Sequence, residues 1–195
     1  MISSRLTALA RQFTAERGLN GFTIQELCGE VGVSRRTFFN YFRAKEDAVL
    51  GVDSEEELRR LGEQFLARGS RGWPAVLEDL VRLAADHADE AGMNMRAHAD
   101  LMAAIGREPR LLSRFIGLTH ERERALVALV AAREGVTDAD PYARAAIHVL
   151  STIMRSAGER LLDSTEDADF GAALSDSLAA IRAVTATPSK RTESE

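Results

Sequence analysis

The chain has 195 residues, of which 45% are hydrophobic, and it carries a net charge of −5. This length and apolar content are typical of a soluble protein with a sizeable core and at most two small domains. No stretch approaches the roughly 18 apolar residues of a membrane span, and the N-terminus lacks a signal-peptide layout, so we expect a cytoplasmic protein. A single cysteine excludes an intrachain disulfide framework, and Cys28 is expected to be an inert core residue.

The first predicted helix carries an apolar stripe from Ile2 to Phe13 and ends at Gly18 and Gly21. Two further short helices follow it within the first 50 residues. Together the three helices predict a minimal helix-turn-helix module.

The second predicted helix begins at a well-defined cap. Thr23 can accept a hydrogen bond from the first turn, and Glu26 can reach back to the Thr23 amide, so the pair predicts a capping box. Phe22 and Leu27 occupy the positions of a hydrophobic staple around the same cap. The helix ends at Gly32, where we expect the turn of the motif.

The third predicted helix is the most informative element of the chain. Ser34 is its expected N-cap, and Val33 and Phe38 can form a second staple. Phe38 and Phe42 share one face, which predicts that this face is buried. The opposite face carries Arg36, Asn40 and Arg43.

The chemistry of this polar face fits the edges of DNA bases. The alternative is an ordinary solvated helix face. An arginine can donate to both major-groove acceptors of guanine, and an asparagine can pair with adenine, so Arg36 and Asn40 are candidates for base readout. We expect Thr37 and Phe39 to face the bases or the groove wall as well, and other residues to meet phosphates. The predicted DNA-binding residues are Thr23, Ser34, Arg35, Arg36, Thr37, Phe39, Asn40, Tyr41 and Lys45, of which Thr23, Tyr41 and Lys45 are assigned to phosphates.

The distribution of charge agrees with this hypothesis. Residues 1–50 hold seven basic and five acidic side chains, whereas the rest of the chain holds 18 basic and 25 acidic ones. Basic residues therefore gather where phosphates would lie, and an acidic body would limit nonspecific binding.

The N-terminal segments resemble the signature of the TetR family of bacterial transcriptional regulators. The matching segments are Gly18, Phe22–Ile24, Leu27–Cys28, Val31–Ser34, Thr37–Phe39, Tyr41–Phe42 and Lys45–Asp47. The resemblance covers about the first quarter of the chain, and the remainder agrees only in length and helical character. Two departures stand out: many members carry tyrosine where this chain has Phe39, and the chain has little of the basic N-terminal arm that some members possess.

The remainder of the chain is predicted to be helical, which makes the fold class all-α: an N-terminal three-helix helix-turn-helix domain and a C-terminal helical ligand-binding and dimerisation domain. The predicted helices run from Glu46 through Leu66, from Pro74 to Gly92, from Met93 to Ile105, from Pro109 to Gly135, from Asp140 through Leu161, and from Asp167 or Asp169 to Val184. The expected domains are residues 1–47 (DNA binding) and 48–187 (effector binding and dimerisation), with a disordered tail at 188–195.

A ligand pocket is expected within the helical body, because several large apolar residues there accompany a few polar ones. The candidate wall residues are Phe65, Trp73, Met95, His98, Met102, Phe115, Ile116 and His120, any of which could instead be ordinary core. The sequence does not name the ligand.

No enzyme, cofactor or metal site is predicted. His120 and Glu121 begin like a zinc-protease helix, but Arg124 occupies the position of the second histidine ligand. His87, His98 and His120 could converge on a metal, although isolated histidines on separate helices are usually structural.

The last two predicted helices are expected to form a homodimer by packing as a four-helix bundle. The predicted interface residues are Ala146, Val149, Leu150, Ile153, Ala157, Phe170, Leu174, Leu178 and Ile181. The alternative is that these faces only cover the core of their own domain.

The resemblance implies a homodimeric, sequence-specific DNA-binding transcriptional regulator, most simply a repressor that a small, largely apolar effector releases from a palindromic double-stranded operator. Ligand binding in the body would rotate or spread the DNA-binding heads. A ligand-dependent activator of the same fold is the first alternative. A helical enzyme, or a helical binding protein without DNA function, is the other.

Overall fold

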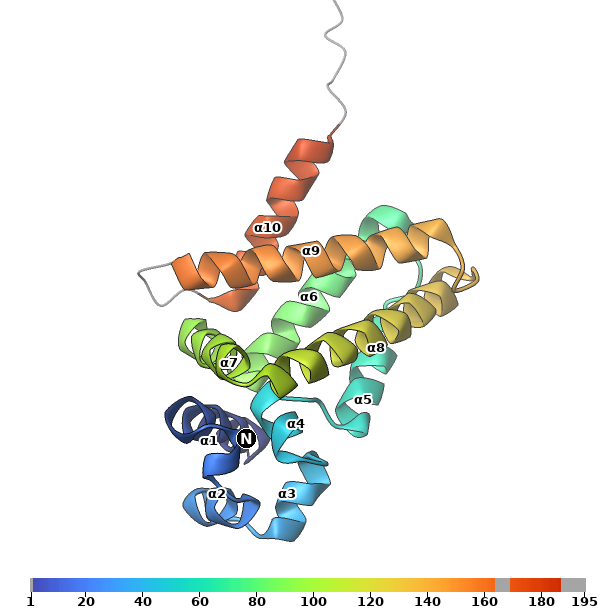
Figure 1. The fold of residues 1–195 in the computed structure, drawn as a ribbon. Helices are drawn as coiled ribbons and strands as arrows, with labels where there is room; N and C mark the ends of the chain where they lie inside the picture. The colour runs from blue at the N-terminus through green and yellow to red at the C-terminus, as the bar shows by residue number, and fades with distance from the viewer. Residues whose placement is uncertain (1, 164–168, 187–195) are drawn as a thin grey trace, which may run out of the picture.

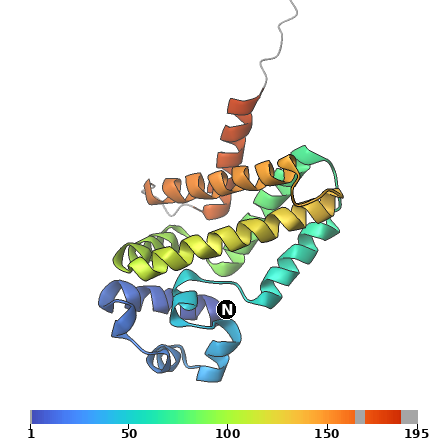
Figure 2. The ribbon, with the colours of Figure 1, turned by 45° about the vertical axis from the view of Figure 1, so that its right-hand side comes forward.

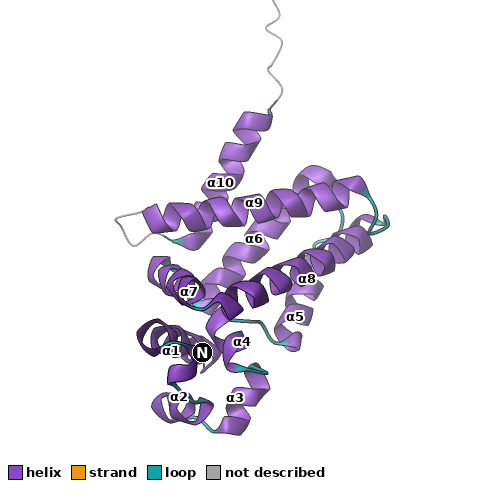
Figure 3. Cartoon of the chain, viewed as in Figure 1, coloured by secondary structure: helices purple, strands orange, loops and turns teal. Residues whose placement is uncertain are grey.

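The computed structural model describes residues 2–163 and 169–186, which fold into a small N-terminal head and a larger helical body (Figure 1). The described ranges contain helices and loops (Figure 3). One isolated β-bridge joins Asn94 and Asp169 in these ranges. The predicted all-α fold class is therefore confirmed. The head contains α1 (Ile2–Arg17), the short 3-10 helix η1 (Leu19–Gly21), α2 (Ile24–Val31) and α3 (Arg35–Tyr41). The other helices are α4 (Lys45–Leu50), α5 (Glu55–Ala67), α6 (Trp73–Ala91), α7 (Met95–Arg107), α8 (Pro109–Glu134), α9 (Pro141–Asp163) and α10 (Phe170–Thr185).

The head is built around one apolar cluster that joins α1, α2 and α3. Its central side chains are Phe13, Phe22, Leu27, Phe38 and Phe42, each no more than 5% exposed. Cys28 is also buried there, and burial raises the pKa of its thiol. This thiol is therefore a core group, as the sequence predicted.

The prediction of a single helix from Glu46 through Leu66 is wrong, because the structure has two helices there, α4 and α5. Gly51 ends α4 in the left-handed conformation with φ of 69°, which favours glycine over residues that carry a Cβ atom. Ser54 then begins α5: its hydroxyl accepts from the Glu57 amide, and the Glu57 carboxylate accepts from the Ser54 amide. A capping box thus starts a new helix four residues after the first one has ended.

The helix α4 belongs to the core of the head rather than to that of the body. Ala48, Val49 and Leu50 are buried in the same cluster as the aromatic residues of α1–α3. The domain boundary proposed after residue 47 therefore falls inside α4.

The body packs α6, α8, α9 and α10 around a second apolar cluster. Helix α10 lies against both α6 and α9, and α8 and α9 lie next to each other (Figures 1 and 2). The innermost side chains, which are almost fully buried, are Phe65, Val76, Leu80, Val130, Ile147, Ile153, Leu161 and Leu174. Helix α7 lies between this cluster and the head, and it packs against α1 on one side and α9 on the other.

A buried charged group joins α5, α6 and α8 at the far end of the body. Asp79 is fully buried and accepts hydrogen bonds from Arg133 at 3.0 Å, Arg71 at 2.6 Å and Arg68 at 3.3 Å. Burial alone would raise the pKa of Asp79, but the hydrogen bonds from Arg133 and Arg68 and the charge of Arg71 outweigh it and lower the pKa. The Arg133 guanidinium also lies 4.0 Å from the centre of the Phe65 ring.

Two predictions made from the sequence lie outside the described residues. These are the disordered tail at 188–195 and Asp167 as a helix start; Asp169 caps α10 instead, by accepting from the amides of Gly171 and Ala172. No helix of the described ranges is long and apolar enough to cross a membrane.

Candidate nucleic-acid interface

Helices α2 and α3 form the helix-turn-helix predicted from the sequence. Thr23 caps α2 by accepting from the Glu26 amide at 3.1 Å, and Ser34 caps α3 by accepting from the Thr37 amide at 3.0 Å. Between the two helices Gly32 adopts φ of 77°, and its amide donates to the carbonyl of Cys28. This left-handed residue ends α2 and sets the direction of α3.

The outer face of α3 exposes basic, aromatic and amide side chains to solvent. Its exposed side chains are Arg35, Arg36, Phe39 and Asn40. Thr37 and Tyr41 are half-buried beside them, and the Thr37 hydroxyl lies 2.8 Å from that of Ser34. Arg36 makes no ion pair with any described residue, so both its charge and its donors are available on this face.

Phe39 is the aromatic member of this face. The residue is 48% exposed, and its ring meets the buried Phe38 ring edge-on, with ring centres 5.4 Å apart and an interplanar angle of 89°. The Arg35 guanidinium lies 6.0 Å from the centre of the Phe39 ring. The ring is thus supported from beneath and flanked by a positive charge one helical turn earlier.

Two acidic residues take roles that were not predicted from the sequence. The predicted capping box at Thr23 is only half formed, because the Glu26 carboxylate accepts from Arg17 at 2.6 Å instead of returning to the Thr23 amide. Arg17 also lies over the Phe13 ring, which draws Glu26 towards α1. Glu55, at the start of α5, forms an exposed ion pair with Arg43 at the end of the polar stripe of α3.

Lys45 points into the head. Its ammonium donates to the main-chain carbonyls of Leu19 at 2.6 Å and Phe22 at 2.8 Å, and it lies 4.8 Å from the centre of the Phe22 ring. The side chain therefore ties the first residue of α4 to the segment between α1 and α2.

The head is joined to the body by apolar side chains of α7 and α8 that lie in the same buried cluster, and by polar contacts with these two helices. Arg11 is buried and donates to the carbonyl of Val49 at 2.9 Å and to that of Ala97 at 3.1 Å. Burial lowers the pKa of Arg11 to about 10, although the charge of Asp100 opposes the shift. One guanidinium thus holds together α1, α4 and α7.

A second contact joins the start of α8 to η1. The Glu108 carboxylate accepts from the Leu19 amide at 2.7 Å, and Arg107 donates to the carbonyl of Ala15 at 2.8 Å. Gly18 has φ of 74°, and a Cβ atom there would lie 2.9 Å from Glu108 Oε1. The left-handed conformation favours glycine at this position, and a larger residue would also displace the Glu108 carboxylate from the Leu19 amide.

A third set of contacts involves Arg114 and Arg122 of α8. Arg114 donates from Nε and Nη2 to the buried Asp47, at 3.1 and 2.7 Å. Asp53, in the α4–α5 linker, accepts from Arg122 at 2.7 Å and from His87 at 2.9 Å. The hydrogen bond to Asp53 raises the pKa of His87 even though burial opposes the shift. None of these head–body contacts was predicted, because their partners are far apart in the sequence.

Comparison with known proteins agrees with this geometry in both halves of the chain. Residues 6–51 match the family model of bacterial regulatory proteins of the tetR family. Residues 71–186 match a tetR-type C-terminal model described as the MftR C-terminal domain, and this match alone covers more than half of the chain. The chain belongs to the tetR family.

A curated relative is the HTH-type transcriptional regulator TcmR of Streptomyces glaucescens. It is 31% identical over 134 residues, which cover 65% of this chain and 57% of TcmR. The chain thus spans a little over half the length of this tetR-family relative.

The structure does not gather the predicted pocket residues of this tetR-family body around one hollow. Phe65 is fully buried, whereas Phe115, Ile116 and His120 lie on an exposed face of α8. The others are half-buried at separate places: Trp73 stacks on Tyr142, His98 stacks on Phe170, Met95 packs against the body cluster and Met102 packs against the head cluster. Residue type predicted apolar surroundings but not which side of each helix faces inward.

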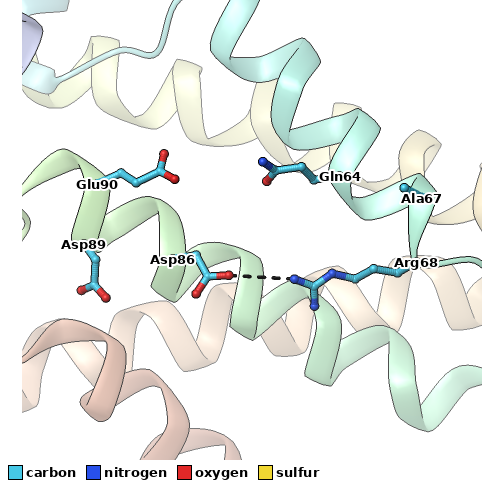
Figure 4. Close-up of a pocket in the computed structure, with 6 residues that line it drawn as sticks. All are labelled: Gln64, Ala67, Arg68, Asp86, Asp89 and Glu90. Carbon is cyan, nitrogen blue, oxygen red and sulfur yellow. Dashed lines mark ion pairs between the residues drawn. The ribbon is translucent and has the colours of Figure 1, made fainter.

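Two open hollows lie beside α6 instead. The first, of about 620 Å³ between α5 and α6, is polar and mainly acidic (Figure 4). Its lining residues are Gln64, Ala67, Arg68, Asp86, Asp89 and Glu90. The second, of about 680 Å³, lies between α6 and α10. Neither hollow includes a residue predicted for the pocket, so the effector site remains a proposal.

The histidines considered for a metal site lie apart. His87 binds Asp53, His98 packs beside Gly158, and His120 is exposed on α8. Within residues 2–163 and 169–186, no group of three or more metal-ligating side chains is arranged to hold an ion.

The side chains predicted for the dimer interface need correction, because most of them lie in the core of their own body. Six of the nine are at most 6% exposed: Leu150, Ile153, Ala157, Phe170, Leu174 and Leu178. Ala146, Val149 and Ile181 are half-buried. The apolar stripes of α9 and α10 cover α6 and each other, so a dimer through these helices would use their outward faces.

Proposed function

We propose that this tetR-family protein is a homodimeric, sequence-specific DNA-binding repressor that a small, largely apolar ligand releases from a palindromic operator. The observation that carries the proposal is the outer face of α3. It presents the unpaired Arg36 and the amide of Asn40, side by side, on a helix that both caps and core hold firmly. These two side chains have the chemistry that reads guanine and adenine in the major groove.

In this proposal α3 occupies the major groove, and its neighbours position the head on the backbone. Arg35, Arg36, Thr37, Phe39 and Asn40 face the groove. Thr23, Ser34 and Tyr41 lie at its edges, where their hydroxyl groups can reach phosphates. Lys45 is assigned a positioning role, because its ammonium already serves two carbonyls of the head.

Release by a ligand would proceed through the contacts between head and body. A ligand that moved α7 or the start of α8 would displace Ala97, Glu108 or Arg114, and each of these residues binds the head directly. A typical coupling between two sites is about 1–3 kcal/mol, which is comparable to the loss of one or two such hydrogen bonds.

Dimerisation would place two heads on the two halves of a palindrome. The outward face of α10 carries the exposed residues Ala172, Ala179 and Ala183, and α9 carries the exposed Ala145 and the half-buried Val149. Small side chains allow helices of two subunits to approach closely. Recognition helices of such a dimer would lie about 34–36 Å apart, or a multiple of the helical turn.

The decisive experiment is selection of binding sites from a randomised DNA pool by the purified full chain, followed by mobility-shift titration and sedimentation. A palindromic site bound by two chains supports the proposal. Arg36→Ala should weaken binding to that site by about 5- to 150-fold and relax the preference at one base position. Arg59→Ala removes another exposed arginine, on α5, and should change neither property.

Failure to select any sequence would overturn the proposal, and an unchanged base preference in Arg36→Ala would show that the recognition face is misplaced. Adding lipophilic compounds to the complex then tests release. A compound that strengthens DNA binding would identify the activator alternative.

A further inference from the structure

Phe39 is the one exposed phenyl ring of the described head. Phe13, Phe22, Phe38 and Phe42 are each at most 5% exposed, whereas Phe39 is 48% exposed. The core of the head is therefore complete without this ring. Single exposed apolar side chains are common on protein surfaces, so what distinguishes Phe39 is its position among Arg36 and Asn40 on the outer face of α3.

The ring is held in place rather than free to collapse onto the surface. The Phe38 ring supports it edge-on from beneath, and the Arg35 guanidinium lies on the same face at 6.0 Å from its centre. Arg36 and Asn40 are its neighbours on the exposed surface of α3. Whatever surface meets these two hydrogen-bonding side chains must also meet the phenyl ring.

Only one group in the major groove matches a phenyl ring chemically. The base edges there consist of hydrogen-bond donors and acceptors, apart from the C5 methyl group of thymine. The ring of Phe39 carries no hydroxyl and so cannot bond to a phosphate, and its negative face disfavours an anion. A contact with thymine instead removes apolar surface from water on both sides.

We propose that Phe39 selects thymine at one position of each operator half-site by packing its ring against the C5 methyl group. The inference rests on the proposed DNA-binding function and adds a third base preference to those of Arg36 and Asn40. Arg35 and Phe38 act as positioning residues that keep the ring upright. The contact requires no change in the charge or hydrogen bonding of the base.

The test replaces each thymine of the selected operator, one position at a time, with deoxyuridine, which lacks only the C5 methyl group. For the wild-type protein we expect one thymine per half-site at which this change weakens binding by about fourfold, the factor that corresponds to burial of one methyl group. Thymines elsewhere in the site should tolerate the replacement. The DNA is altered and the protein is not, so folding of a variant does not affect this measurement.

Two variants then assign the effect to the ring. Phe39→Ala should bind the thymine and uracil sites equally, with a circular dichroism spectrum like that of the wild type. Leu58→Ala removes a similarly exposed apolar side chain, 46% exposed on α5, and should keep the full uracil penalty. Two outcomes would overturn the inference while the proposed function stands. One is tight operator binding that uracil does not weaken at any position, and the other is a loss of affinity for the uracil site that persists in Phe39→Ala. If no operator can be selected at all, the proposed function fails and the inference fails with it.

Discussion

Replacing Lys45 with methionine separates a role inside the head from a role at the DNA backbone. Methionine keeps most of the length and apolar stem of lysine but has no donor. The wild-type ammonium makes two short hydrogen bonds to carbonyls and lies 4.8 Å from the Phe22 ring centre. Hydrogen bonds from a charged group contribute about 1.5–3 kcal/mol each when buried, and cation–π contact about 0.5–1 kcal/mol at an exposed site.

These contributions add up to about 3.5–7 kcal/mol for a buried group; because Lys45 is only partly buried, we expect a smaller loss of about 2–3 kcal/mol. For a chain of this length each kcal/mol lowers the melting temperature by about 2–4 °C, so the expected shift is roughly 5–10 °C. Thermal unfolding followed by circular dichroism measures it. Arg5→Met removes an exposed charge from α1 and should shift the melting temperature by no more than about 2 °C.

The second readout is the salt dependence of DNA binding. If Lys45 neutralised a phosphate, its removal would reduce the slope of log affinity against log salt by about one. The structure leads us to expect an unchanged slope, because the ammonium is already bound within the head. An unchanged melting temperature together with a slope reduced by about one would refute the structural role and restore the phosphate contact predicted from the sequence.

Three further changes test other parts of the molecule. Asp79→Ala removes the partner of Nη1 of the buried Arg133 and leaves that guanidinium only its neighbour Glu134. The change should cost about 3–5 kcal/mol and lower the melting temperature by about 10 °C, whereas loss of the exposed Asp176 should have little effect. The pKa of His87 is raised in the folded protein, so its ion pair with Asp53 stabilises the fold at pH values below the pKa of the unfolded state. This stabilisation is lost as the pH rises through the folded pKa. The melting temperatures of wild type and His87→Gln should therefore differ in acid and become equal in base. Leu178→Glu should unfold the body, seen as a lower melting temperature at every protein concentration, instead of yielding folded monomers.

Features governed by neighbouring residues were predictable from the sequence. The caps at Thr23 and Ser34 and the turn at Gly32 depend on groups within four positions along the chain. The burial of Phe38 was indicated by its helical spacing from Phe42. The break between α4 and α5 was missed although Ser54 and Glu57 have the spacing of a capping box, because the apolar pattern was followed across it.

Features that depend on distant partners could not be predicted in this way. Glu108 binds Leu19 across 89 positions, and Arg114 binds Asp47 across 67, so no local spacing indicates either contact. The same reason explains the misassigned dimer residues. An apolar stripe such as that around Leu174 shows that a helix face is covered, but not whether its own domain or a second subunit covers it.

The division between α4 and α5 also affects how movement can pass through the molecule. An unbroken helix over residues 45–67 would be a stiff rod roughly 35 Å long, and turning its body end would turn the head by the same angle. Two rods joined at Gly51 behave differently, because rotation about the backbone bonds of the linker absorbs a displacement of α5 before it reaches α4. We therefore expect the head to respond in steps as individual contacts with α7 and α8 break, and to tilt about this joint once they are lost.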